Sequence, residues 1–550
     1  MSVGMTAAGA AVGVGVAASL AFVYIFVVAP ARSPLNVMPG PRSTHWFFGN
    51  IRDIFDIMWK QGKFPEPILS WVNQYGGVFY YRAMMSDRIL LTDPVALKYV
   101  AVTNSDIYPR DFGTRTIFRD LIGGDGLLST EGATHAQQRK MLQPLFRHDK
   151  IKSFLGIFQH HVRRLQEHHL RAVEATDARP GQAVNLHKLF TKLTMDIIGV
   201  SAFSYNFDAL APVDPTATAP RGTHGSASQI SVMEALELLL TPPSLLYVVG
   251  IFFLPFFPHW PLPPQNRRRR AQRKLFQVVD AVLEAKLAPS RPPPTAATTP
   301  STSRKMLDLV DLMLEESNDP KVSLDEARMH VMTFMLAGHE TTSSMLSWVF
   351  AVLAQHPTEE AKARAECRQV LAANNDSWDW KALGELKYTT AVIHEVLRLF
   401  PTASQLSTRV CIEDNYMPTS ETTTAGDTKT YFIPKGATVV VHTGSLHRNP
   451  KYWSQPNEFL PERFLEGSAL FEADKALRGG QGNAFYYMPF SAGPKNCIGM
   501  RFAMAELQVV VAALLTRHSF RLTNNANVLP TMVGVTMRPR HLDMTVHVVD

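Results

Sequence analysis

The sequence predicts a globular body of helices with a small β region, preceded by one N-terminal transmembrane helix. Three stretches lead to this prediction. Residues 6–30 contain no charged side chain, and roughly 20 apolar residues are enough to cross a bilayer as a helix. Residues 77–92 combine aromatic and branched side chains, which are typical of strands. Residues 327–355 are largely apolar and contain no proline, which favours a long helix.

The composition indicates a large hydrophobic core in a reducing compartment. The chain has 550 residues, of which 46% are hydrophobic and 19% charged. Its three cysteines, Cys367, Cys411 and Cys497, are an odd number in a long chain, which argues against a disulfide framework and for a reducing compartment. The net charge of +7 suits nucleic acid, an anionic membrane surface or an acidic protein partner equally well. Because the sequence carries no nucleic-acid-binding signature, we expect no nucleic-acid partner.

Residues 1–31 are expected to form a membrane anchor. A cleaved signal peptide is the alternative, but its apolar region spans only ~7–15 residues and follows a positive segment that is missing here. Arg32, Arg42 and Arg52 follow the apolar run, and the positive-inside tendency therefore places the rest of the chain in the cytosol. A proline-rich hinge, residues 32–44, connects the anchor to the globular body, residues 45–550.

Two stretches rich in Pro, Thr, Ala and Ser, residues 209–228 and 288–303, are expected to be surface loops. The aromatic stretch between them, residues 245–262, has two interpretations. It forms either a buried pair of helices or a segment that dips into the bilayer and opens the substrate channel to lipid. In the second case the four arginines at 267–270 would meet lipid head groups.

The loop at residues 490–499 places a cysteine immediately before a helix. Gly493 and Gly499 permit a tight turn, and residues 500–507 have helical periodicity. Backbone amides and the positive end of the helix dipole at this position favour a Cys497 thiolate. Such a thiolate is a candidate nucleophile, zinc ligand or iron ligand. A nucleophile needs a nearby His and zinc needs several Cys or His at short spacing, and neither set lies near Cys497 in the sequence.

Two helical segments carry further polar residues. In the middle of residues 327–355, Gly338, Glu340 and Thr341 interrupt an apolar helix, where polar groups are costly unless they are satisfied. Gly338 lies three residues before Thr341 and leaves bare backbone on the same face as the hydroxyl. His135 and Arg139 are four residues apart and share one helix face, an arrangement that is also typical of a solvated surface.

The spacing of Phe490, Gly493, Lys495, Cys497 and Gly499 resembles the haem-binding loop of the cytochrome P450 superfamily. The family usually has Arg where this chain has Lys495. The resemblance implies a mostly α fold with small β sheets (α+β) behind the anchor, as in the membrane-anchored microsomal members. It also implies a haem b cofactor whose iron is ligated axially by the Cys497 thiolate.

The same resemblance assigns roles to the other polar residues. Gly338 would make room for O2, Thr341 would hydrogen-bond the activated oxygen and Glu340 would help to relay protons. His135, where most members have Trp, and Arg139 would contact one haem propionate, and Arg409 the other. A buried ion-pair triad beside the cysteine loop is implied for Glu395, Arg398 and Arg463.

The implied activity is that of a monooxygenase, which inserts one atom of O2 into a small hydrophobic, lipid-like substrate. The sequence has no dinucleotide fingerprint, so electrons would come from a separate protein, the NADPH–cytochrome P450 reductase. We expect a monomer in the endoplasmic reticulum membrane, single-pass, with a cytosolic catalytic domain. A haem-thiolate isomerase or dehydratase acting on a lipid hydroperoxide is the first alternative, against which Glu340 and Thr341 argue. A non-catalytic haem-binding membrane protein is the second.

Overall fold

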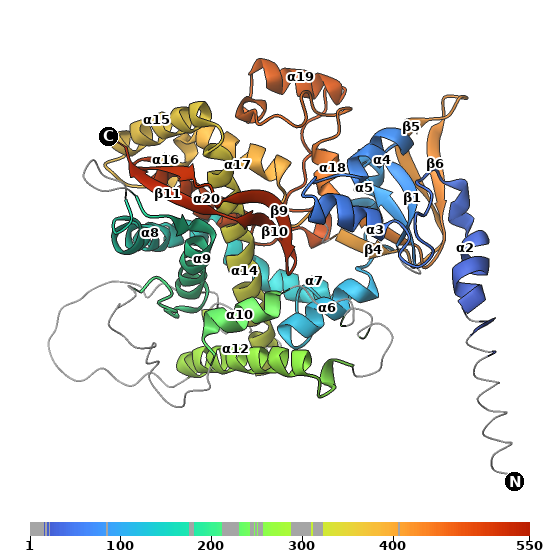
Figure 1. Cartoon of the computed structure of the whole chain (residues 1–550), viewed down its shortest axis with the longest axis horizontal. Helices are drawn as coiled ribbons and strands as arrows, with labels where there is room; N and C mark the ends of the chain where they lie inside the picture. Colours follow the sequence, from blue (N-terminus) through green and yellow to red (C-terminus); the bar gives the residue numbers. More distant parts are fainter. Residues whose placement is uncertain are drawn as a thin grey trace, which may run out of the picture. The chain divides into compact units, whose positions relative to one another are not determined.

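The structure is a computed structural model, and it describes residues 16, 19–20, 22–83, 86–174, 181–211, 230–241, 247, 250, 257–287, 308, 310–311, 323–404 and 407–549. The chain, drawn in Figure 1 with colours that follow the sequence, divides into two compact units. The first comprises Met1–Asp111, Gln405–Pro456 and Leu477–Lys495, and the second comprises Phe112–Ser404, Asn457–Ala476 and Asn496–Asp550. Both units draw on the region that we expected to form the catalytic domain.

A four-stranded sheet organises the first unit. Its order is β1–β2–β7–β4, with β2 and β7 parallel and the other pairs antiparallel. The bounds are β1 Val78–Ala83, β2 Ser86–Leu91, β4 Ser407–Val410 and β7 Thr438–Val441. Strands β1 and β2 confirm the predicted β region, and Phe79, Ile89 and Val439 are fully buried because branched and aromatic side chains pack well on a pleated surface.

Short helices and a second ladder complete the first unit. The ladder pairs β5 (Asn415–Thr422) with β6 (Thr428–Ile433), and it packs on α5 (Pro94–Lys98). Asp93 begins α5, because its carboxylate accepts from the amides of Val95 and Ala96 at 3.0 Å. Its other helices include α3 Ile51–Ile54, α4 Ile68–Tyr75 and α18 Thr443–His447.

The start of the first unit contains the predicted anchor and hinge. Most of the anchor, residues 1–15, 17–18 and 21, lies outside the described residues, which continue as η1 (Tyr24–Val28) and α2 (Ala29–Ala31). Within the described part of the chain, no helix combines the length and apolarity needed to cross a membrane. The hinge packs along β1, since Tyr80 donates its amide to the Pro39 carbonyl at 2.9 Å. A Cβ on Gly40 would lie 1.9 Å from the Tyr80 carbonyl oxygen, so this approach requires glycine.

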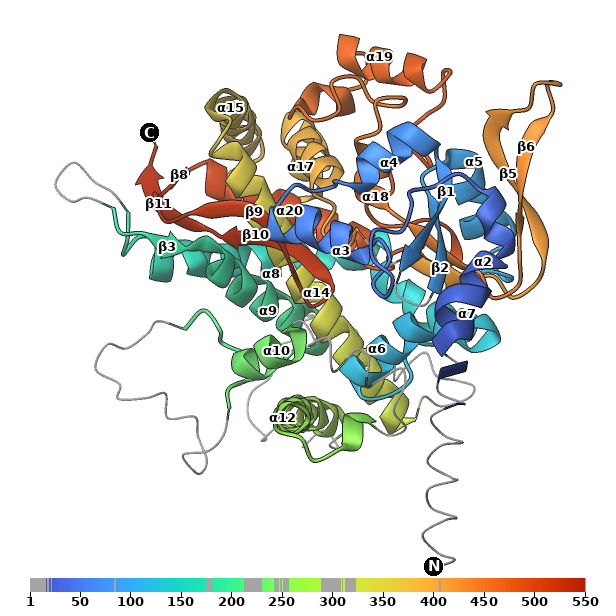
Figure 2. The same cartoon turned by 45° about the vertical axis from the view of Figure 1, so that its right-hand side comes forward.

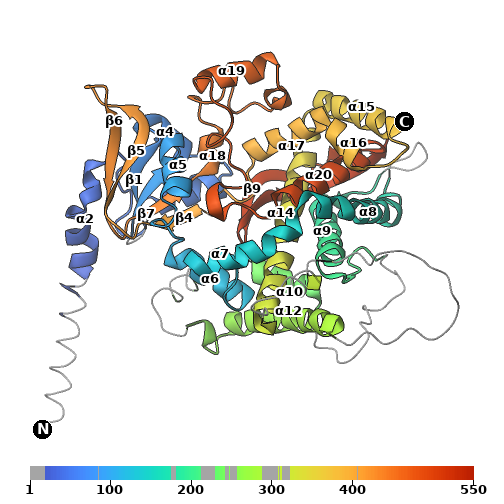
Figure 3. The same cartoon turned by 180° about the vertical axis from the view of Figure 1, so that it is seen from behind.

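The second unit is predominantly helical. Its helices are α6 Phe112–Ile122, α7 Gly132–Leu142, α8 His148–Leu165, α9 Leu186–Phe203, α10 Val232–Leu240, α12 Pro263–Leu287, α14 Leu324–Leu353, α15 Pro357–Ala373, α16 Trp380–Glu385, α17 Lys387–Leu399, α19 Ala469–Leu477 and α20 Met500–Leu515. Its small sheets are β3–β11–β8 (Val184–Asn185, Asp543–Val548, His518–Leu522) and β10–β9 (Thr536–His541, Asn527–Val533). Figure 3 shows α8 and α9, which pack against each other. This architecture confirms the α+β prediction.

Helix α14 lies at the centre of the second unit. It packs against α9, α12, α17, α20 and strand β10, and Figure 2 shows it crossing between them. Ser323 begins the helix, because its hydroxyl accepts from the Glu326 amide at 3.1 Å. The helix ends at Leu353, two residues before the predicted end and four before Pro357, which begins α15.

The predicted loops lie largely outside the described residues. This applies to residues 212–228 and 288–303, and also to residues 251–256 of the aromatic stretch. The described remainder of that stretch includes Tyr247, whose hydroxyl donates to Asp120 at 2.7 Å, and Phe257, which is buried. Trp260 is 39% exposed. These contacts tie part of the stretch to the second unit, and the bilayer interpretation of residues 251–256 stays a prediction.

Candidate active site

Cys497 lies in the turn before α20, as predicted. Gly499 is the residue that precedes the helix, and its carbonyl accepts from the Ala503 amide at 2.9 Å, so the helix begins directly after the turn. The Cys497 side chain is exposed, whereas Cys367 and Cys411 are buried. Cys497 is therefore the cysteine that can reach a ligand.

The environment of the Cys497 sulfur has opposing effects on its pKa. Although part of the side chain is accessible, protein atoms crowd the sulfur, and this desolvation raises the pKa of the thiol. The Gly499 amide, which donates to the sulfur, and the guanidinium of Arg139 both lower it. The predicted donors are thus present, but burial outweighs them. A metal cation at the sulfur would add the charge that a stable thiolate needs.

Arg139 holds the residue that precedes the cysteine. Its Nη1 donates to the Asn496 carbonyl at 2.7 Å, and its Nη2 donates to Asn496 Oδ1. Arg139 and His135 both lie on α7, as predicted, and His135 is buried. Burial lowers the pKa of Arg139, and Cys497 opposes this effect. The arrangement makes α7 a support for the cysteine loop, which the sequence did not predict because Asn496 is 357 residues away from Arg139.

Beyond its first turns, helix α14 is buried except for one window. From Met329 to Leu353, all of which the structure describes, every side chain is buried except at Ala337, Gly338 and Thr341. These three positions share a face at helical spacing. The window contains Gly338 and Thr341 of the polar cluster that the sequence singled out, whereas Glu340 is buried. It is where a ligand can approach this helix.

The window presents one hydroxyl and one close helix contact. Thr341 Oγ1 donates to the Ala337 carbonyl at 2.8 Å, which leaves its lone pairs available to accept. A Cβ on Gly338 would lie 2.9 Å from both Cγ1 and Cδ1 of Ile198 on α9. The small size of Gly338 therefore serves the packing of α14 on α9, a role that the sequence did not predict.

Glu340 points to a neighbouring strand. The residue is buried, and its Oε1 accepts from the hydroxyl of Thr536 on β10 at 2.7 Å. The carboxylate of Glu340 also opposes the lowering of the Arg538 pKa that burial causes. Next to it, His339 is fully enclosed, and burial lowers its pKa. Glu340 is thus a buried acid whose hydrogen-bond partner comes from the C-terminal sheet.

The remaining predicted cofactor residues lie in the first unit. Phe490 and Lys495 are half-buried, and Arg409, on β4, is buried. Gly493 has φ +73°, and a Cβ there would lie 1.9 Å from the Ala101 carbonyl oxygen. Glycine is therefore obligatory at 493. At Gly499 a Cβ would meet Phe146 only at 3.8 Å, so that turn does not require glycine for space.

The predicted buried triad is confirmed. Arg398 donates from Nε to Glu395 Oε2 at 2.7 Å and from Nη2 to Oε1 at 2.8 Å. Arg463 donates from Nε to Glu395 Oε1 at 3.0 Å. All three side chains are 0% exposed. Arg463 also pairs with Asp474 of α19, which the sequence did not predict.

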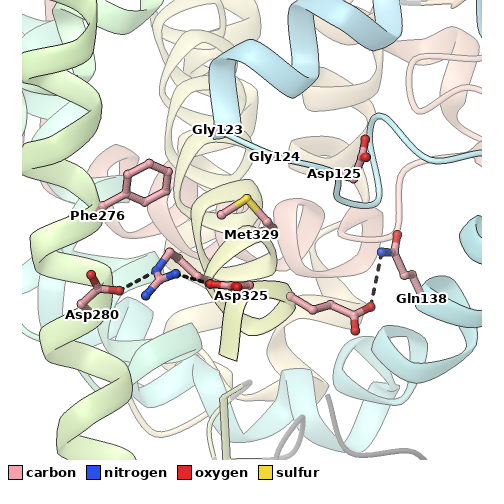
Figure 4. A pocket seen from close by; sticks show the side chains of 10 residues that line it. Gly123, Gly124, Asp125, Gln138, Phe276, Asp280, Asp325 and Met329 are labelled. Atoms are coloured by element: carbon pink, nitrogen blue, oxygen red, sulfur yellow. Dashed lines mark hydrogen bonds and ion pairs between the residues drawn. The ribbon is translucent and has the colours of Figure 1, made fainter. Parts of the chain in front are cut away.

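A hollow of about 680 Å³ lies at the start of α14 (Figure 4). Its charged lining groups are paired with one another or with nearby residues. Arg328 donates to Asp280 at 2.6 Å and also pairs with Asp325, and Asp125 pairs with Arg119. Cys497 and Thr341 are not among its lining residues, so we do not assign the active site to this hollow.

Comparison with known proteins gives a consistent result. The family model for cytochrome P450 matches residues 38–546. The chain is 30% identical over 488 residues to cytochrome P450 4A24 of Sus scrofa, covering 88% of this chain and 85% of the relative. It is 28% identical over 500 residues to cytochrome P450 4X1 of Homo sapiens, covering 89% and 86%. It is 27% identical over 533 residues to cytochrome P450 monooxygenase 128 of Postia placenta, covering 93% and 91%.

Proposed function

Because the chain belongs to the cytochrome P450 family, we propose that it is a monooxygenase that inserts one atom of O2 into a small hydrophobic, lipid-like substrate. Electrons would come from NADPH through a separate reductase. One observation carries the proposal: Cys497 is an exposed residue in the turn before α20, with the Gly499 amide and the Arg139 guanidinium beside its sulfur.

These residues fit a haem. A lone exposed cysteine suits one axial iron ligand and does not supply the several ligands of a structural zinc site. The positive charge of the iron would add to the Gly499 amide and the Arg139 guanidinium and offset the burial that raises the pKa of the thiol. When bound, the haem would supply the iron at which O2 is activated. We propose that Cys497 holds the iron and that His135, Arg139 and Arg409 bind the propionates, with Lys495 making a single point contact where Arg could fork. Phe490, Gly493 and Gly499 would shape the loop.

Two residues of α14 would hold and supply protons at the window formed by Ala337, Gly338 and Thr341. Thr341 Oγ1 holds its proton against the Ala337 carbonyl and can accept a second hydrogen bond at the window. We propose that Thr341 positions the reacting oxygen and that Glu340, held by Thr536, supplies protons from the interior. Gly338 would leave room for O2 at the window, and Ala337 adds only a methyl group to it.

The proposal includes a location in the endoplasmic reticulum membrane, with an N-terminal anchor, a cytosolic catalytic region and a monomeric state. The uncharged run at residues 6–30 supports the anchor. Phe26 packs against Trp46 and Phe47, with ring centroids 5.4 and 5.7 Å apart, and Trp46 is 62% exposed. Aromatic side chains of this kind suit the boundary between lipid and water.

Two measurements test this function. The carbon monoxide difference spectrum of the reduced, full-length protein should show thiolate ligation, which Cys497→Ser should abolish and Cys367→Ser, at a buried cysteine, should retain. NADPH and O2 consumption should then depend on added reductase. Turnover of a lipid hydroperoxide without reductase or NADPH would instead support an isomerase or dehydratase, and haem binding without either activity would support a non-catalytic protein.

A further inference from the structure

Helix α19 contacts the rest of the second unit through a buried ion pair between Asp474 and Arg463. The structure describes all 9 of its residues, and Asp474 is the only buried one. None of the apolar residues of the helix is fully buried, and Leu477 at its end is 46% exposed. A helix normally packs through an apolar stripe, so a single buried carboxylate is an unusual attachment.

Asp474 completes the charge balance of the buried triad. Glu395 carries one negative charge, whereas Arg398 and Arg463 carry two positive charges. The triad alone would therefore bury a net charge of +1. Asp474 pairs with Arg463 Nη1, and both side chains are 0% exposed, so the four residues sum to zero. Buried charges are tolerated when they are paired and hydrogen-bonded, and an unpaired one is strongly destabilising.

The network is linked through helix packing to the cysteine loop. Glu395 lies on α17, which packs on α20. The two helices are joined by a hydrogen bond from Gln508 Nε2 to Thr390 Oγ1 at 2.7 Å. Helix α20 begins at Met500, three residues after Cys497. The position of α17 therefore bears on the position of the turn that holds the sulfur.

We propose that Asp474 is a positioning residue of the active site. It acts as the fourth member of the buried network, neutralises Arg463, holds α19 in place and, through α17 and α20, fixes the Cys497 turn. The effect on the cysteine turn rests on the proposed haem function, whereas the charge balance does not.

The test compares Asp474→Asn with Glu472→Gln in the full-length protein. Glu472 is exposed on the same helix, so its variant removes the same charge without touching the network. Asp474→Asn should lower the ratio of folded to unfolded protein ~10²-fold or more, because it leaves the buried network with a net charge of +1. It should also accelerate hydrogen exchange at residues 461–464 and 469–477, and haem transfer to an apo-acceptor. Glu472→Gln should behave as the wild type.

Two further variants keep the proposal testable if Asp474→Asn does not fold. The double variant Asp474→Asn/Arg463→Gln removes both charges and leaves Glu395 paired with Arg398, so it should be more stable than the sum of its single changes predicts. Asp474→Glu keeps the charge and should retain the thiolate-type carbon monoxide spectrum better than Asp474→Asn. Additive effects in the cycle, or an Asp474→Asn protein that behaves like Glu472→Gln, would overturn the proposal.

The readouts separate this inference from the proposed function. If the wild-type protein shows no thiolate-type spectrum, the haem function fails, while hydrogen exchange and the double-mutant cycle still test the charge network. If Asp474→Asn loosens only α19 and leaves haem transfer and the spectrum unchanged, Asp474 is an anchor of that helix alone and the positioning role is wrong.

Discussion

Arg139 donates two hydrogen bonds to Asn496, from Nη1 to the carbonyl oxygen at 2.7 Å and from Nη2 to the side-chain amide oxygen. Asn496 immediately precedes Cys497, so the guanidinium fixes the backbone that presents the sulfur. The planar fork of arginine suits two acceptors at once, whereas lysine offers one mobile point charge. In this chain, therefore, the arginine expected to bind a propionate also supports the ligand loop directly.

Arg139→Lys should weaken the cysteine turn. The substitution keeps the positive charge but loses the two-point grip, which is worth about 1.5–3 kcal/mol for a hydrogen bond from a charged donor. We expect a lower unfolding temperature and faster haem transfer to an apo-acceptor. Lys140→Gln, at an exposed neighbour on the same helix, is the control and should change neither. Equal haem transfer in Arg139→Lys and wild type would show that the grip on Asn496 does not matter.

Local patterns in the sequence predicted the helices and strands. The hydrogen-bond and ion-pair partners of the site residues lie far away in the sequence, and the local patterns did not predict them. The apolar run predicted α14, and the glycine-bounded loop placed Cys497 before α20. Glu340 was predicted as a site residue, but its partner Thr536 is 196 residues away. The sequence did not single out Asp474, because an acidic residue on a short helix is usually solvated. The burial of Asp474 depends on the contact between α19 and Arg463. A single sequence contains no record of such pairings.

Gly338→Ala should destabilise the packing of α14 on α9. Its Cβ would lie 2.9 Å from two carbons of Ile198, and overpacking of this kind costs about 1–3 kcal/mol. Denaturant unfolding should show this loss. Gly384→Ala on α16 is the matched control, because a Cβ there meets nothing within 4 Å. In the double variant Gly338→Ala/Ile198→Ala, the smaller side chain at 198 should remove the clash with the new Cβ. If the losses of stability of the two single variants simply add, the proposed clash with Ile198 is wrong.

Thr341→Ala should uncouple electron use from oxidation. The hydroxyl is the polar side-chain group at the exposed window of α14, and general acid assistance is worth about 10²–10⁴ in rate. We expect normal haem content but more hydrogen peroxide released per NADPH consumed in the reductase-coupled reaction. Thr341→Ser retains the hydroxyl and should stay close to the wild type. Unchanged coupling in Thr341→Ala would remove the assigned role.

Arg398→Lys should fail to hold haem. Arg398 donates two hydrogen bonds to Glu395 and a third to the Glu458 carbonyl at 3.1 Å, and its side chain is fully buried. Lysine cannot reproduce this fork, and a broken buried pair costs about 3–5 kcal/mol. The measurement is haem content per protein after purification, beside the unfolding free energy. Lys362→Arg, at a pair with Glu462 near the surface, provides a control in which the same two residue types are exchanged.

Glu506→Gln should make the protein more stable than the wild type at higher pH. Glu506 is buried on α20, and desolvation raises its pKa well above the usual 4.5, although a hydrogen bond with Thr342 opposes the shift. The folded state therefore binds this proton more tightly than the unfolded state. The stability that the protonated Glu506 carboxyl contributes is fully present below the unfolded pKa of about 4.5, and it is lost as the pH rises through the folded pKa. Gln cannot ionise and avoids the loss. Unfolding temperatures at about pH 5 and about pH 8 should diverge less in Glu506→Gln than in the wild type or in Glu472→Gln, and an equal divergence would mean that Glu506 does not titrate differently on unfolding.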